Sequence, residues 1–188
     1  AGLRERMIEY GQFIADKVAG MEQAEVYFYG LVDCPEEGKK AGEYFNEHNV
    51  DLILAHAGTY VTSASVLPVH QICNAFTVIL NLQPTARINY AVTTTGEWLA
   101  HCGACPVPEL ANAFNRAGIS CRIVNGLLGM DHTPEISMTD ENTAERPEAK
   151  RAWKEIGEWV KAASVKAGLR GSRFGFLGGY YCGMLDMY

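Results

Sequence analysis

The sequence predicts an α/β fold, namely a flavodoxin-like doubly wound parallel sheet with helices on both faces. Strand-like and helix-like segments alternate along the chain, which is the order in which crossover helices connect parallel strands. Residues 50–56 and 76–82 are near-continuous apolar runs, as expected of parallel strands covered on both faces. The 188 residues, 48% of them hydrophobic, can bury one substantial core. Residues 1–188 are therefore expected to form a single domain.

The first half of the chain is expected to begin with an amphipathic helix, because apolar residues recur there at helical spacing. These residues are Leu3, Met7, Tyr10, Ile14 and Val18. The next predicted elements are a strand at 25–32, a helix at 35–46 that begins with Pro35, the strand at 50–56, a short helix at 65–75 with Pro68 in its first turn, and the strand at 76–82.

The second half is expected to continue the alternation. A short strand leads into Thr93-Thr94-Thr95, because β-branched residues favour strands. Gly118 and Gly168 are expected to end two helices. The other predicted elements are a helix at 108–117, a strand at 120–128, an exposed polar loop at 131–147, a long helix at 148–167 and a last strand at 173–177.

Composition excludes several classes of function. The formal net charge is −6, and the sequence contains no cluster of Lys and Arg, so a nucleic-acid surface is not expected. No apolar run reaches the roughly 18 residues of a membrane span, and no signal-peptide pattern is present. Six cysteines spread through an α/β pattern are expected to be reduced. Together these features predict a cytoplasmic protein without a membrane or nucleic-acid partner.

The most informative stretch is residues 93–110. It combines a predicted strand end, a glycine-containing loop with polar and aromatic side chains, and a helix whose first turn holds Pro108 and Glu109. In open α/β sheets, such strand-to-helix loops line the crevice in which ligands bind. A second loop of this kind follows the strand at 50–56. The sequence therefore predicts a binding site at one edge of the sheet.

Four segments resemble, in the same order, landmarks of the sugar isomerases related to L-arabinose and L-fucose isomerase. They cover nearly the whole chain: residues 2–7, residues 50–60, Ala100-His101 with Gly103 in the central loop, and residues 173–179 with 183–186. The resemblance implies the N-terminal domain of a larger enzyme, because the catalytic carboxylates and histidines of this family lie further along the chain. Relatives would have a strand before the opening helix, and the chain stops in an apolar segment. Both ends are therefore expected to be cut, with the first strand missing.

The resemblance implies a metal-dependent aldose–ketose isomerase that acts on a pentose or a deoxyhexose. Its divalent metal, Mn²⁺, and its carboxylates would lie in later domains and would shuttle a proton between C1 and C2 through an ene-diol. This chain would supply walls of the sugar pocket and subunit contacts in a homo-oligomer, either trimer-based or a hexamer. No metal ligand and no catalytic residue is expected within the chain, which alone should not catalyse.

Five residues are candidates for sugar binding. His101 can bond sugar hydroxyls near neutral pH, and the resemblance places it in a Gln-Thr-Ala-His-Gly-Gly run in which Trp98 replaces the Gln. Trp98 offers a stacking face. Glu97 could bind the sugar, or act as a general base if it is desolvated, or instead be solvated or cap a helix. Thr59 and Tyr60 match a Thr-Phe pair of the family, although Gly58 stands where the family has His.

Two other interpretations remain open. The chain could be a non-catalytic sugar-binding module of flavodoxin-like fold, which would bind its ligand without metal. It could also be a redox protein that uses Cys102 and Cys105, which form a C-x-x-C pattern. The redox interpretation requires a thiol of lowered pKa. A zinc ribbon is not expected, because it would need a second cysteine pair at similar spacing.

Overall fold

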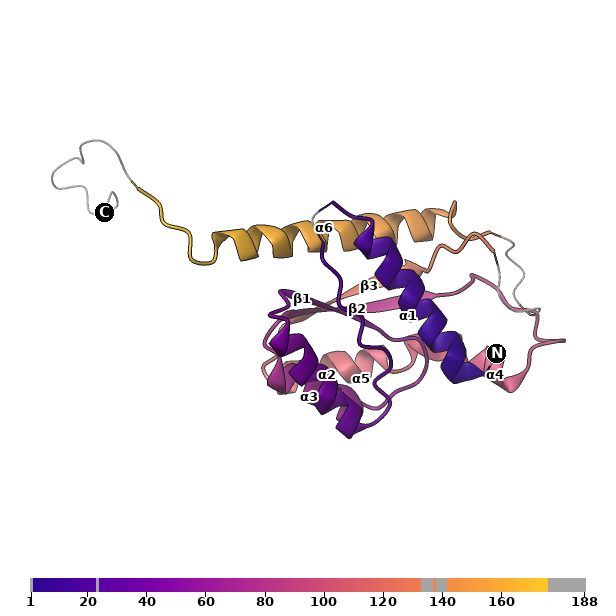
Figure 1. Ribbon diagram of the computed structural model, residues 1–188. Helices are drawn as coiled ribbons and strands as arrows, with labels where there is room; N and C mark the ends of the chain where they lie inside the picture. Colours follow the sequence, from indigo (N-terminus) through magenta and orange to yellow (C-terminus); the bar gives the residue numbers. More distant parts are fainter. Residues whose placement is uncertain (1, 23, 133–136, 138–141, 176–188) are drawn as a thin grey trace.

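The computed structural model describes residues 2–22, 24–132, 137 and 142–175, and in this part of the chain three parallel strands form one sheet with helices on both faces (Figure 1). Along the chain the elements are α1 (Leu3–Ala19), α2 (Pro35–Glu47), β1 (Leu52–His56), α3 (Ser63–Ile72), β2 (Phe76–Gln83), α4 (Thr95–Leu99), the 3₁₀-helix η1 (Cys102–Ala104), α5 (Val107–Arg116), β3 (Cys121–Leu127) and α6 (Pro147–Leu169).

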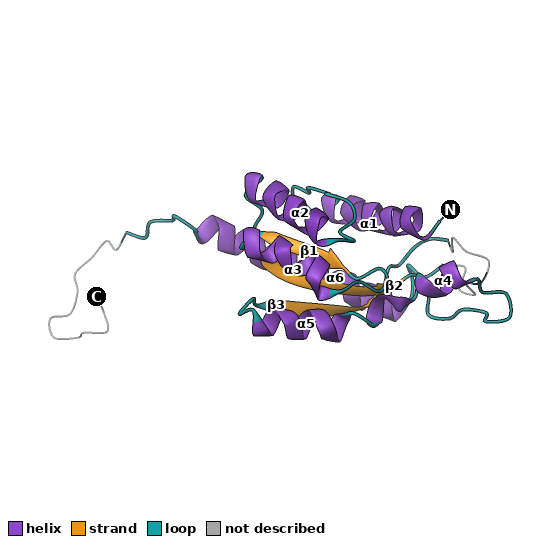
Figure 2. Ribbon diagram, turned by 90° about the horizontal axis from the view of Figure 1, so that it is seen from below, coloured by secondary structure: helices purple, strands orange, loops and turns teal. Residues whose placement is uncertain are grey.

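The strands lie in the order β1-β2-β3, and each pairs in parallel with its neighbour. Ile53 lies opposite Thr77, and Ile79 lies opposite Ile123. The crossovers between consecutive strands are α3 and α5, which lie together on one face of the sheet (Figure 2). The α/β class with parallel strands is therefore confirmed.

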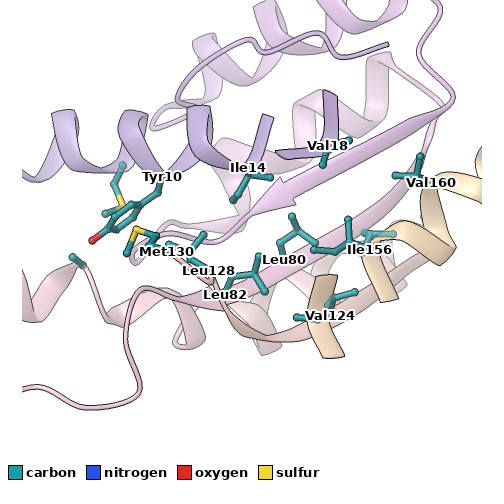
Figure 3. Close-up of a cluster of buried hydrophobic side chains, with 14 residues drawn as sticks. Tyr10, Ile14, Val18, Leu80, Leu82, Val124, Leu128, Met130, Ile156 and Val160 are labelled. Carbon is teal, nitrogen blue, oxygen red and sulfur yellow. The ribbon is translucent and has the colours of Figure 1, made fainter. Parts of the chain in front are cut away.

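One face of the sheet is covered by α1 and α6. Tyr10, Ile14 and Val18 of α1 and Ile156 and Val160 of α6 pack on the side chains that the strands direct to this face (Figure 3). Those strand residues, Val78, Leu80, Leu82 and Val124, are at most 2% exposed. The predicted spacing of the opening helix is confirmed, since four of its five apolar residues are buried there.

The other face is covered by α2, α3 and α5. Phe114 of α5 is fully buried and packs with Ile79 of β2 and Leu110. Ala41 of α2 and Val69 of α3 form a further cluster with Ile53 of β1. Gly118 follows α5 with a φ of +71°, so the predicted glycine stop of this helix is confirmed.

The predicted strand at 25–32 is wrong. Residues 24–33 lie outside any helix or strand, although Val26, Tyr27 and Phe28 are typical strand formers. A strand forms only where another strand supplies hydrogen bonds, and no described segment pairs with residues 24–33. Propensity alone therefore does not produce a strand here.

Four further boundaries differ from the predictions. No strand leads into Thr93, because Thr94 caps α4 instead. Pro68 lies in the second turn of α3, since that helix begins two residues earlier than predicted, at Ser63. α6 continues through Gly168 to Leu169. Residues 173–175 are not a strand, and the rest of the predicted strand at 173–177 lies outside the described residues.

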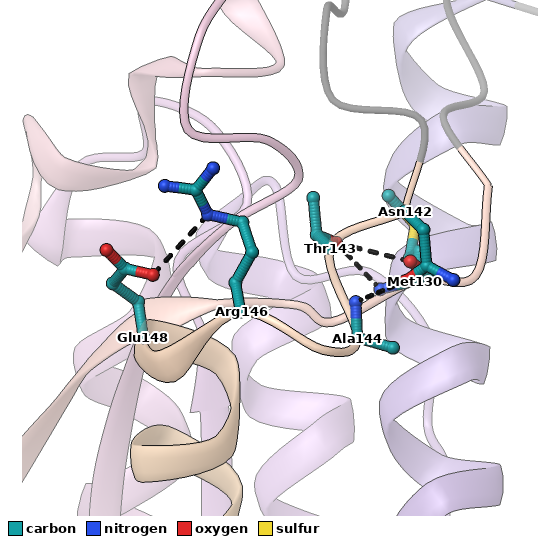
Figure 4. Close-up of polar contacts among 6 residues, drawn as sticks. All are labelled: Met130, Asn142, Thr143, Ala144, Arg146 and Glu148. Atoms are coloured by element: carbon teal, nitrogen blue, oxygen red, sulfur yellow. Dashed lines mark hydrogen bonds and ion pairs between the residues drawn. The ribbon is translucent and has the colours of Figure 1, made fainter.

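Among the described residues of the predicted exposed loop at 131–147, Asp131, His132, Asn142, Glu145 and Pro147 are exposed, whereas Thr143 is buried. Thr143 is 1% exposed and hydrogen-bonds with Met130 through both its backbone and its hydroxyl group (Figure 4). Each of these two bonds measures 2.9 Å, one from Thr143 N to Met130 O and one from Met130 N to Thr143 Oγ1. This pairing holds the start of α6 against the end of β3.

None of the described helices combines the length and the hydropathy that crossing a membrane would require.

Candidate functional site

Two loops predicted to form a site meet at the carboxyl end of the sheet. Thr59, three residues after β1, donates a hydrogen bond from its hydroxyl to the backbone carbonyl of Leu99, at 2.8 Å. Gly103 of η1 lies directly against the first loop, because a Cβ atom added there would be only 2.0 Å from the carbonyl oxygen of Ala57. Parallel strands end at the same edge of a sheet, which brings these loops together although 40 residues separate Thr59 from Leu99.

The short helix α4 is held by a capping box. The carboxylate of Glu97 accepts a hydrogen bond from the backbone N–H of Thr94 at 2.7 Å, and the backbone N–H of Glu97 donates to the Thr94 hydroxyl at 3.3 Å. This reciprocal pairing satisfies two N–H groups that a helix start leaves open. Glu97 is only 9% exposed. In the structure this residue caps α4, which is one of the roles considered for it.

His101 lies one turn after Glu97. Its Nδ1 atom is 2.9 Å from the backbone carbonyl of Glu97, so Nδ1 carries the hydrogen and donates. The Nε2 atom of the ring is buried within the protein. The imidazole is half-buried, and its orientation is fixed by the helix that the capping box begins.

Trp98 and Tyr60 present large aromatic surfaces at the same edge. Their side chains are 48% and 55% exposed, respectively. The Tyr60 hydroxyl lies 3.4 Å from a carboxylate oxygen of Glu109. Both rings are therefore open to a ligand or to a neighbouring molecule.

A small cavity of about 270 Å³ lies between the start of α1 and α4. Its polar lining comes from Arg6, Thr94 and Glu97, and its other lining residues are Gly2, Leu3, Gly96 and Ala100. This volume lies just below the range of typical ligand sites, which runs from roughly 300 to 1,000 Å³. Of the five candidate residues, Glu97 alone lines it. Trp98 lies in α4 and His101 follows it. Thr59 and Tyr60 lie in the loop after β1, where they line another cavity, of about 1,070 Å³.

Glu109 was not predicted as a site residue, yet it connects the two loops. Its Oε1 atom accepts hydrogen bonds from the backbone N–H and the hydroxyl of Ser63, each at 2.9 Å. The N–H of Ser63 at the start of α3 lowers the pKa of Glu109, and the Ser63 hydroxyl lowers it further. The sequence did contain a signal for this residue, namely an acidic side chain directly after Pro108. We interpreted Glu109 only as a first-turn residue of a helix.

Replacement of Thr59 tests whether the two loops depend on each other. Thr59→Val keeps the shape of the side chain but removes the donor to Leu99, so the free energy of unfolding should fall by about 1 kcal/mol. Thr59→Ser keeps the hydroxyl and is the matched control. Chemical denaturation measures the free energy of unfolding of both variants. If both variants lose the same amount of stability, the hydrogen bond to Leu99 contributes nothing to it.

The described residues do not provide a metal site. Nowhere in residues 2–22, 24–132, 137 and 142–175 do three His, Cys, Asp or Glu side chains come together in a way that could hold an ion.

The C-x-x-C pattern lies in and directly after η1. Cys102 is buried and Cys105 is exposed. Burial raises the pKa of the Cys102 thiol, and the neighbouring Cys105 raises it further. A redox site needs the opposite shift, so the geometry disfavours the redox interpretation.

No protein-family model matches the chain, and the comparison with curated proteins found no match. The resemblance to sugar isomerases therefore rests on the short landmarks in the sequence. Two of these landmarks, residues 50–60 and the loop around His101, are the segments that the structure brings into contact.

Proposed function

We propose that this chain is the N-terminal domain of a metal-dependent aldose–ketose isomerase of the L-arabinose and L-fucose isomerase type. The single observation that supports this most is the contact between the two loops that resemble the family, made through Thr59 and Leu99. In this proposal the loops form one wall of a sugar pocket.

The side chains at this edge have the chemistry that a sugar needs. Sugar hydroxyls require hydrogen-bond donors and acceptors, and the C–H faces of a sugar ring pack on aromatic rings. In this proposal His101 and Thr59, whose hydrogens are donated to the backbone carbonyls of Glu97 and Leu99, are the polar residues of the wall. Trp98 and Tyr60 supply exposed aromatic faces. The substrate is accordingly proposed to be a pentose or a deoxyhexose.

Mn²⁺ and the carboxylates that move the proton are proposed to lie in later domains of the full-length enzyme. When bound there, the metal would polarise the sugar oxygens. The pocket walls would serve a neighbouring subunit in a homo-oligomer, either trimer-based or a hexamer, in the cytoplasm. The exposure of Trp98 and Tyr60 is consistent with a surface that another chain or a sugar covers.

We also propose that the fold is flavodoxin-like and doubly wound, with a first strand before α1. Two features support this: α3 and α5 share one face of the sheet, and α1 and α6 share the other.

The proposed role of His101 is tested in a polypeptide that carries this chain together with the later domains. His101→Ala removes a hydrogen bond worth on the order of 1 kcal/mol, so KM for the sugar should rise about fivefold while kcat and the affinity for Mn²⁺ stay unchanged. Exposed His132 lies outside the proposed wall, and His132→Ala is the matched control.

Two outcomes would contradict this role. Loss of Mn²⁺ by His101→Ala would make His101 a metal ligand and would place the catalytic centre in this chain. Kinetics identical to those of His132→Ala would reduce His101 to a loop residue that serves only its own backbone contact with Glu97.

A further inference from the structure

The C-x-x-C pattern has no role in the proposed sugar site, although it follows His101 directly. Cys102 begins η1, and Cys105 is the residue after it. The backbone N–H of Cys105 donates to the carbonyl oxygen of Cys102 at 3.1 Å, which closes one 3₁₀ turn. The two thiols therefore come from the two ends of a single hydrogen-bonded turn.

This turn places the two thiols within bonding reach of each other. A 3₁₀-helix has three residues per turn and rises about 2.0 Å per residue, so residues three apart have Cα atoms about 6 Å apart and side chains one above the other. A disulfide needs a Cα–Cα separation of roughly 4.4–6.8 Å. The thiols of Cys102 and Cys105 are already in hydrogen-bonding contact. The geometry of the turn is therefore that of a pair able to form a disulfide.

The backbone on both sides of Cys105 is held in place. Gly103 lies against the loop after β1, where an added Cβ would be 2.0 Å from the carbonyl oxygen of Ala57. Pro106, the residue directly after Cys105, is fully buried. A bond between the two sulfur atoms can therefore form with little movement of the backbone.

The two cysteines differ in their access to solvent. Cys105 is exposed, whereas Cys102 and the other cysteines in the described part of the chain are buried or half-buried. The buried Cys102 thiol donates to the backbone carbonyl of Trp98 at 3.6 Å. A small molecule in solution therefore reaches Cys105 first, and Cys102 can react only through Cys105.

We propose that Cys102 and Cys105 are a modification site, at which a small disulfide of the glutathione class oxidises the pair to an intramolecular disulfide. Cys105 is the attacking thiol and Cys102 is the resolving thiol. In a redox protein the pair would pass electrons to other molecules, whereas here the pair is itself the substrate of the oxidation. The proposal is independent of the sugar isomerase function.

The oxidation takes place in two thiol–disulfide exchanges. In the first, Cys105 loses its proton to solvent, its thiolate attacks one sulfur of glutathione disulfide, and a glutathione thiolate leaves. In the second, Cys102 loses its proton, its thiolate attacks the Cys105 sulfur of the mixed disulfide, and the other glutathione thiolate leaves. The two released thiolates take up two protons. The pair thus loses two electrons, and one glutathione disulfide is reduced to two glutathione thiols.

Burial of Cys102 makes the intramolecular disulfide slow to reopen. An external thiol can reach only the Cys105 sulfur, so Cys102 is the thiolate that must leave during reduction. Burial raises the pKa of the Cys102 thiol, and a thiol of higher pKa leaves more slowly. The intramolecular disulfide should therefore reopen more slowly than a mixed disulfide with glutathione at Cys105.

The test incubates the reduced 188-residue chain with glutathione disulfide, blocks the remaining thiols with iodoacetamide and analyses tryptic peptides by mass spectrometry. Cleavage after Arg87 and Arg116 gives a peptide whose only cysteines are Cys102 and Cys105. This peptide should become lighter by two hydrogens and should not be alkylated. Cys102→Ala removes the resolving thiol, so this variant should carry roughly tenfold more glutathione on Cys105, because resolution within one chain has an effective concentration in the millimolar range.

Cys105→Ser and Cys121→Ser are the controls. Cys105→Ser should form no disulfide at Cys102, whereas Cys121→Ser should be oxidised like the wild type. The proposal is overturned if the wild type keeps glutathione on Cys105 without closing the pair, if the peptide is not modified, or if Cys102 in Cys105→Ser reacts as fast as Cys105 does in the wild type. No sugar or metal is present in these measurements, so failure of the isomerase proposal would leave them unchanged.

Discussion

Gly103→Ala should destabilise the protein by about 3 kcal/mol, at the upper end of the cost of forcing extra atoms into a packed site. The added methyl group would meet the backbone oxygen of Ala57 at 2.0 Å, and a backbone atom cannot rotate away. η1 would have to move from the loop that follows β1, and the hydrogen bond between Thr59 and Leu99 would stretch or break. Denaturant titration measures the loss of stability.

Gly96→Ala is the matched control for this substitution. Gly96 lies in α4, and an added Cβ would meet no atom within 4 Å. Because Ala favours a helix over Gly by roughly 1 kcal/mol, this variant should be as stable as the wild type or slightly more stable. If both variants lose the same stability, close packing at Gly103 is not what holds the two loops together.

Acid should destabilise the protein strongly between pH 6.5 and pH 4. His70 is 6% exposed, and burial lowers its pKa to about 4. Its Nδ1 atom lies 2.8 Å from the Thr77 hydroxyl, and its ring packs against Phe114. In the unfolded chain the pKa is about 6.5, so below that pH the unfolded state binds a proton that the folded state does not.

The sign follows from this difference in proton binding. Stability due to neutral His70 is complete above pH 6.5 and falls as the pH drops toward 4, by about 3 kcal/mol in total. His56, whose pKa is also lowered to about 4 by burial, adds to the same slope. Unfolding free energies measured at several pH values should show this decrease in stability between pH 6.5 and pH 4.

His70→Gln should reduce this slope by about 1.4 kcal/mol per pH unit, the contribution of one proton. His132→Gln, at an exposed position, is the control and should leave the slope as in the wild type. An unchanged slope in His70→Gln would mean that the folded protein accommodates the imidazolium at this site.

Much of the fold could be predicted because burial on two faces leaves a clear pattern. The apolar runs at 50–56 and 76–82 correspond to β1 and β2, since helices cover both of their faces. Residues 25–32 show the limit of this reasoning. Their strand propensity is high, but strand formation depends on a partner that is not visible in the local sequence.

The candidate site was predicted in part. The first loop follows the predicted strand at 50–56, whereas the strand predicted before Thr93 does not form. The structure nevertheless brings Thr59 and Leu99 into contact. Thr94 was assigned to a strand end, and Glu97 to either a ligand-binding or a helix-capping role. The Thr-x-x-Glu pattern of a capping box would have decided between these roles. The contact of Glu109 with Ser63 spans 46 residues, and no local pattern predicts it.

The most direct test of the proposed function is an isomerisation assay with L-arabinose, L-fucose and D-arabinose in the presence of Mn²⁺. It compares the purified 188-residue chain with a polypeptide that also carries the later domains. We predict turnover by the longer polypeptide only, because the proposal places Mn²⁺ and the catalytic carboxylates in the later domains. Turnover by the 188-residue chain alone, or none of the three sugars converted by the longer polypeptide, would contradict the proposal.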